Sequence, residues 1–63
     1  MDNQVLEKER FAAWKRNVNH LVEATTGLSC DDLPDMPYRD WFDDNVSSAR
    51  AAMRVIREWR KEL

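Results

Sequence analysis

The feature that most constrains this chain is a long stretch in which apolar positions recur at alternating steps of three and four. The series consists of Phe11, Trp14, Val18, Leu21 and Thr25. This spacing places the whole series on one face of an α-helix. Asp2 or Asn3 can accept hydrogen bonds from the first free amides, and Gly27 can adopt the left-handed conformation that ends the last turn. The pattern predicts a helix over about residues 4–26.

Two prolines interrupt the helical pattern after this first helix. Ser29 begins a Ser-x-x-Asp capping arrangement, and Pro34 cannot continue a helix. We therefore expect a turn-rich connector over residues 27–35, with room for one helical turn. Asp35 can cap the helix that follows, with Pro37 in its first turn, where the missing amide proton costs nothing.

A short second helix is predicted over about residues 36–44. Tyr38, Trp41 and Phe42 follow one another at helical spacing in this stretch. The helix is expected to stop at Asn45, because asparagine is the best residue after glycine for a left-handed cap.

A third helix is predicted over about residues 48–62, with Ser47 as its cap. One stripe of this helix is apolar and consists of Ala52, Ile56, Trp59 and Leu63. A second stripe is entirely basic and consists of Arg50, Arg54, Arg57 and Lys61.

These elements predict an all-α fold: a small three-helix domain with a long first helix, a short second helix, a basic third helix and no sheet. We expect residues 1–63 to form a single domain, because the chain is too short for two. The longest stretch without a charge, residues 24–30, is far shorter than the roughly 20 apolar residues of a membrane span. The first ten residues also lack the apolar core of a signal peptide. We therefore expect no membrane contact and a cytoplasmic location.

Charge is divided unevenly along the chain. Residues 1–29 carry four acidic and four basic side chains, residues 30–46 six and one, and residues 47–63 two and five. The acidic side chains of the middle stretch are Asp31, Asp32, Asp35, Asp40, Asp43 and Asp44. Two interpretations remain open. Either the acidic and basic stretches neutralise one another within the fold, or each one meets a partner of opposite charge.

Two classes of function follow from the second interpretation. The candidate contacts of a protein partner are Asp31, Asp32, Phe42, Asp43, Arg50, Arg54, Arg57 and Lys61. Binding of nucleic acid is the alternative, because a short helix, a tight turn and a basic helix have the outline of a helix-turn-helix. An acidic neighbouring stretch and a net charge of −2 weaken that alternative.

Catalytic and metal-binding motifs are missing from the sequence. Cys30 is the single cysteine, and nothing in the sequence orients His20 toward it as a base. The aspartates around Pro34 lack the glycine turn and the terminal glutamate of a calcium loop. We therefore expect no enzymatic activity, no cofactor, no metal and no small-molecule substrate.

The aromatic side chains predict association. Tyr38, Trp41 and Phe42 cannot all face one core from a helix of about two turns. We expect Trp41 to anchor this helix in the core and Phe42 to contact a protein partner or a second copy in a homodimer. Surplus apolar surface in so small a domain commonly leads to association.

A run of residues with fixed spacing resembles a family of short, uncharacterised bacterial and phage proteins. The run comprises Gly27-Leu28, Asp32-Leu33-Pro34-Asp35, Tyr38-Arg39-Asp40-Trp41 and Ala51-Ala52. The resemblance covers about residues 26–52. It implies a small helical domain and fits a phage-type accessory protein that modulates a bacterial complex, with no catalytic residues to transfer. Arg50 stands where that family has an acid.

Overall fold

The computed structural model describes residues 3–61. Its helices are α1 (Asn3–Thr26), one turn of 3₁₀-helix η1 (Cys30–Asp32), α2 (Tyr38–Asp43) and α3 (Ser48–Lys61). No strand occurs between residues 3 and 61, which confirms the predicted all-α, three-helix fold. Some predicted features lie outside the part of the chain whose side chains are described. They are the cap of the first helix at Asp2 or Asn3, the end of the third helix at residue 62, and Leu63 of its apolar stripe.

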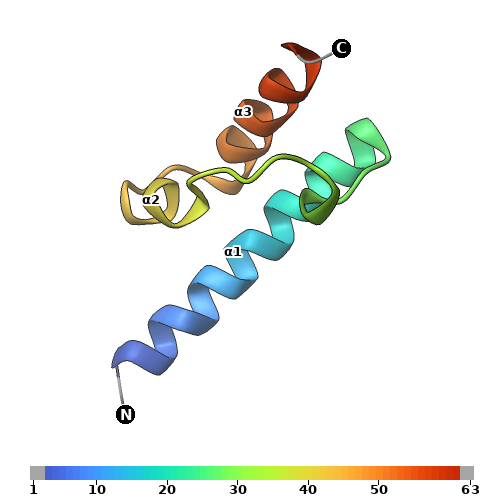
Figure 1. Ribbon diagram of the computed structural model, residues 1–63. Helices are drawn as coiled ribbons and strands as arrows, with labels where there is room; N and C mark the ends of the chain where they lie inside the picture. Colours follow the sequence, from blue (N-terminus) through green and yellow to red (C-terminus); the bar gives the residue numbers. More distant parts are fainter. Residues whose placement is uncertain (1–2, 62–63) are drawn as a thin grey trace.

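Helix α1 is the axis of the molecule. Its first turns project beyond α2, whereas its second half packs against α3 (Figure 1). The molecule is accordingly elongated, with extents of 45 × 19 × 17 Å. Gly27 ends α1 with φ +76° and donates its N–H to the Glu23 carbonyl at 2.9 Å, which confirms the predicted left-handed cap.

The connector is fastened to α1 at its single helical turn. The Cys30 N–H donates to Oδ1 of Asn19 at 2.8 Å, and the Ser29 hydroxyl donates to the Asp32 carboxylate at 3.1 Å. Cys30 is thereby held against the core, with 6% of its surface exposed. Because the adjoining Asp31 and Asp32 side chains stay exposed, the connector presents negative charge on its outer side.

Helix α2 begins later than predicted, at Tyr38, and Asp35 does not cap it. The Tyr38 N–H donates to the Met36 carbonyl at 2.7 Å, and Pro37 between them has φ −77° and ψ 61°. These values define an inverse γ-turn centred on the proline. The turn redirects the chain, so the helix starts after Pro37 and not before it. At the other end, Asn45 has φ 62°, as expected for a left-handed stop.

Helix α3 is capped by Ser47, as predicted: its Oγ accepts the Arg50 N–H at 3.2 Å. Ala51, Ala52, Val55 and Ile56 are buried on the side of α3 that packs against Val18 and Val22 of α1.

The aromatic residue that anchors α2 is Tyr38, and the expectation that Trp41 would do so is wrong. Tyr38 is 8% exposed and belongs to the buried cluster, whereas Trp41 is half-buried at its edge. Lys15 of α1 lies over the Tyr38 ring, with Nζ 4.0 Å from the centroid. A further hydrogen bond joins α1 to the turn between α2 and α3, because Trp14 Nε1–H donates to the Val46 carbonyl at 2.9 Å.

None of the helices between residues 3 and 61 is both long enough and apolar enough to cross a membrane.

Candidate interaction surface

The outward side of α3 is a basic surface. One side of this helix is buried against α1, and the residues at helical spacing on the other side are exposed to solvent. We call the surface formed by Arg50, Met53, Arg54, Arg57 and Lys61 the basic face. At a rise of 1.5 Å per residue it extends for about 16 Å along the helix. The predicted basic stripe is therefore brought together as one surface.

An apolar side chain lies within this basic face. Met53 is 57% exposed, more than any other large apolar side chain in the part of the chain whose burial is described. A shallow hollow of about 300 Å³ is lined by Ala49, Arg50, Met53, Arg54 and Arg57. Methionine is flexible and polarizable, so it adapts to varied partner surfaces. Met53 is not among the contacts predicted from the sequence, although its helical spacing with Arg50 and Arg57 was a signal that could have identified it.

A second, acidic surface lies on the connector and α2. We call residues 31–44 the acidic segment. Its aspartates are all exposed: Asp31, Asp32, Asp35, Asp40, Asp43 and Asp44. The predicted contacts Asp31 and Asp32 are on η1, whereas Asp43 is on α2.

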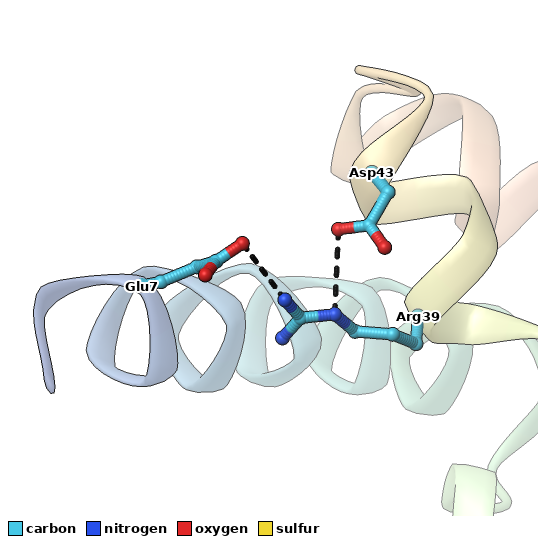
Figure 2. Close-up of polar contacts among 3 residues, drawn as sticks. All are labelled: Glu7, Arg39 and Asp43. Carbon is cyan, nitrogen blue, oxygen red and sulfur yellow. Dashed lines mark hydrogen bonds and ion pairs between the residues drawn. The ribbon is translucent and has the colours of Figure 1, made fainter. Parts of the chain in front are cut away.

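The only base in the acidic segment is used within the molecule. Arg39 points toward α1, where Nη2 lies 2.8 Å from Oε1 of Glu7, and its Nε lies 3.3 Å from Oδ1 of Asp43 (Figure 2). The same guanidinium lies 5.2 Å from the centroid of the Phe11 ring. Arg39 therefore offers little compensation to the remaining aspartates, and Asp43 is already paired.

The two charged surfaces do not neutralise each other within the chain. In the part of the molecule whose side chains are described, the ion pairs are Arg39–Glu7, Arg39–Asp43 and Lys61–Glu58. None of them joins the acidic segment to the basic face. The interpretation in which the two stretches compensate each other inside the fold therefore has no ion pair to support it.

The two surfaces meet at Trp41 and Arg54. The guanidinium carbon of Arg54 lies 5.4 Å from the centroid of the Trp41 ring, and Tyr38 packs edge-on against the same ring at 5.7 Å. In Figure 1, α2 lies beside the start of α3, so the acidic segment adjoins the basic face along this boundary. The boundary is marked by a half-buried tryptophan.

Phe42 faces α1 and not the basic face. Its ring meets Phe11 at 5.3 Å and Trp14 at 5.7 Å, both edge-on. It is half-buried there and lines a groove of about 610 Å³ together with Leu6, Glu7, Arg10, Asp43 and Asn45. The role of Phe42 as a contact residue stays a prediction, and any contact would have to be made within this groove.

The side chains with chemical reactivity are not arranged around one another. His20 is exposed on α1, and Cys30 is buried. The Tyr38 hydroxyl is buried without a hydrogen-bond partner in the described part of the chain. Burial raises the pKa of this hydroxyl well above its usual value, and the nearby Cys30 thiol and Asp35 and Asp31 carboxylates raise it further.

No metal site is recognisable among residues 3–61. Across the residues that the structure describes, no group of three or more His, Cys, Asp or Glu side chains is placed to hold a metal ion.

Comparison of the chain with models of known protein families, with curated proteins and with solved structures finds no match. The resemblance to short bacterial and phage proteins over residues 26–52 therefore stays an expectation from the sequence motif alone.

Proposed function

We propose that this protein is a small, non-enzymatic protein-interaction module that binds its partner through the basic face of α3. The observation that carries the proposal is the exposed Met53 between Arg50, Arg54 and Arg57. Methionine and arginine are both enriched at protein interfaces, where a few apolar or arginine side chains contribute most of the binding energy. The charge of the basic face calls for a partner surface with acidic side chains.

A role without catalysis is supported by the placement of the two most reactive side chains. Nucleophilic catalysis needs a base within hydrogen-bond reach of the nucleophile. Cys30 is buried on η1, His20 is exposed on α1, and no hydrogen bond joins them in the described region. In line with the resemblance, such a module would serve as an accessory subunit or modulator of a bacterial complex.

Binding of nucleic acid is the second candidate, favoured by one observation. Arg50, Arg54 and Arg57 are exposed on one side of a helix that follows a short helix and a turn, which is the outline of a recognition helix. The acidic segment counts against it, because its aspartates adjoin the basic face at Trp41 and repel phosphates. We therefore place protein binding first.

The test compares capture of proteins from an extract of the source cells by three forms of the chain. These are the wild type, Arg50→Glu/Arg57→Glu on the basic face, and Lys8→Glu/Arg16→Glu, which makes the same charge change at exposed positions of α1. The extract is treated with nuclease, and captured proteins are quantified by mass spectrometry. We expect at least one protein, the untagged native chain itself included, to be enriched equally by the wild type and the α1 variant and lost with the basic-face variant.

The nucleic-acid alternative is measured alongside by anisotropy of a labelled duplex over a range of salt concentrations. Phosphate contacts give a steep linear fall of log affinity with log salt, by roughly 0.9 per contacted phosphate. Tight duplex binding with such a slope, lost in Arg50→Glu/Arg57→Glu, would replace protein binding by nucleic-acid binding. Capture that is identical for all three forms would refute a role of the basic face in either.

A further inference from the structure

We infer that the partner of the basic face is a second copy of this chain, in a two-fold dimer where the basic face of each protomer contacts the acidic segment of the other. The inference rests on the proposed function, because it names the partner of the same surface. Three observations carry it: unneutralised charge of both signs, the adjacency of the two surfaces, and apolar side chains at and near their boundary.

The complement that the basic face requires is present in the chain itself. The acidic segment carries exposed aspartates, and its single base, Arg39, is held by Glu7 and Asp43. On the basic face, Lys61 pairs with Glu58, whereas no ion pair is formed by Arg50 or Arg57 in the described region. Charge of both signs is therefore left for contacts between molecules.

The adjacency of the surfaces suits a two-fold axis. The acidic segment and the basic face meet at Trp41 and Arg54, 5.4 Å apart. An axis through this boundary exchanges the two surfaces, so that each protomer's basic face lies opposite its partner's acidic segment and both contacts form together. One second copy thus satisfies both charged surfaces in a closed assembly, whereas a uniformly acidic partner would satisfy one and repel the other.

The size and composition of such an interface are suitable. A standard interface takes about 800 Å² from each partner, which is roughly a sixth of the 4751 Å² surface of this chain. The half-buried Trp41 lies at the proposed axis and the exposed Met53 near it, and tryptophan and arginine are the residues that most often dominate interface energetics. Domains of this size hide only about 60% of their surface on folding, so pairing adds burial that a single chain lacks.

The experiment is complementary charge reversal, followed by sedimentation velocity of the full chain from micromolar to millimolar concentration at about 0.1 M salt, where the Debye length is about 10 Å. Arg50→Glu/Arg57→Glu makes the basic face acidic, and Asp40→Lys/Asp44→Lys makes the acidic segment basic. Each variant alone opposes like charges twice across the axis. We expect each to weaken dimerisation at least about 100-fold.

The equimolar mixture of the two variants is the decisive sample. In the mixed dimer both contacts are attractive again, one with its native signs and the other with its signs exchanged. The mixture is therefore expected to recover wild-type dimerisation to within about tenfold. Lys8→Glu/Arg16→Glu is the matched control, because it makes the same charge change on α1 and should dimerise as the wild type does. Mixed with Asp40→Lys/Asp44→Lys, it restores only one of the two contacts, so it should form its own homodimers and few mixed dimers.

Circular dichroism of every variant checks that the helices persist, and the single changes Arg57→Glu and Asp44→Lys replace any double variant that unfolds. A wild type that stays monomeric to millimolar concentration overturns the inference, as does a dimer that the reversals do not weaken or the mixture does not restore. The failures are distinguishable. A monomeric wild type that still captures another protein through Arg50 and Arg57 contradicts the dimer and leaves the proposed function standing, whereas loss of both results refutes both.

Discussion

Arg54 of α3 lies over the ring of Trp41 of α2, with 5.4 Å between the guanidinium carbon and the ring centroid. This contact joins two helices that are separated by the turn at residues 44–47. It also places the positive charge of Arg54 beside the last residues of the acidic segment. The pair therefore contributes both to the position of α2 and to the shape of the proposed interface.

The first prediction concerns this pair. Arg54→Ala should lower the free energy of unfolding by about 0.5–1 kcal/mol, because an exposed cation over an aromatic ring contributes about that much. Arg50→Ala is the matched control on the same face. Arg50 contacts no ring in the described region, so its replacement should change stability by less than about 0.5 kcal/mol. Urea denaturation followed by circular dichroism measures both, and equal effects would show that the contact with Trp41 is not stabilising.

The second prediction concerns the end of α1. Gly27 has φ +76°, and no heavy atom beyond those of its two chain neighbours lies within 4 Å of the position that a Cβ would occupy. The effect of Gly27→Ala is therefore backbone strain alone, at about 1 kcal/mol, or roughly 4–8 °C in Tm for a domain of this size. Gly27→Asn should cost less, since asparagine tolerates the left-handed region. An alanine variant that melts at or above the wild-type temperature would contradict the cap.

The third prediction concerns the bond from the Trp14 indole to the Val46 carbonyl, 2.9 Å long. Trp14→Phe keeps an aromatic ring but leaves this half-buried carbonyl without the indole donor, which should cost about 1–3 kcal/mol. Trp59→Phe is the matched control, because the Trp59 indole makes no hydrogen bond in the described part of the chain. Chemical denaturation compares the two, and a Trp14→Phe cost no larger than that of Trp59→Phe would contradict the role of this bond.

The fourth prediction concerns alkaline stability. The pKa of the Tyr38 hydroxyl is raised above its ordinary value, chiefly by burial. An unfolded tyrosine ionises near pH 10, so this group leaves stability unchanged below about pH 10. Above that pH the unfolded chain releases its proton first, and stability falls. Tyr38 is the only tyrosine, so its absorbance change should coincide with loss of helical circular dichroism.

Tyr38→Phe separates the hydroxyl from the ring. Because the hydroxyl is buried without a partner in the described region, its removal should leave stability at neutral pH unchanged within about 0.5 kcal/mol or raise it. The variant should also lose less stability than the wild type above pH 10. Ionisation of Tyr38 near pH 10 with the helices intact would contradict the burial of this hydroxyl.

Most of the backbone could be predicted because its determinants are local. Gly27, Asn45 and Ser47 each act on the amides or the backbone angles of their immediate neighbours, and all three perform the predicted role. The start of α2 could not be predicted in the same way. There Asp35 and Pro37 offer alternative local structures, and the inverse γ-turn at Pro37 replaces the side-chain cap.

The burial of the aromatic residues depends on contacts between distant segments. Tyr38 is buried in place of Trp41 because Lys15 and the core of α1 lie on its side of α2, more than 15 residues away in sequence. The pairing of the charged side chains likewise depends on contacts between distant segments. Composition reveals the acidic and basic stretches, but only the fold shows that Arg39 is held by Glu7 and that the stretches adjoin without an ion pair.

In the inferred dimer, the charged surfaces around Trp41 and Arg54 bind a second copy of the chain. The most direct measurement is a dilution series of the ¹⁵N-labelled protein from millimolar to micromolar concentration, recorded as amide correlation spectra. We predict concentration-dependent shifts in residues 40–44 and 50–57 and in the Trp41 indole, lost near 1 M salt, where the Debye length is about 3 Å. Amides on the exposed side of α1, such as Lys8 and Arg16, should not move. Spectra that are unchanged over the whole range, or shifts confined to α1, would contradict the claim.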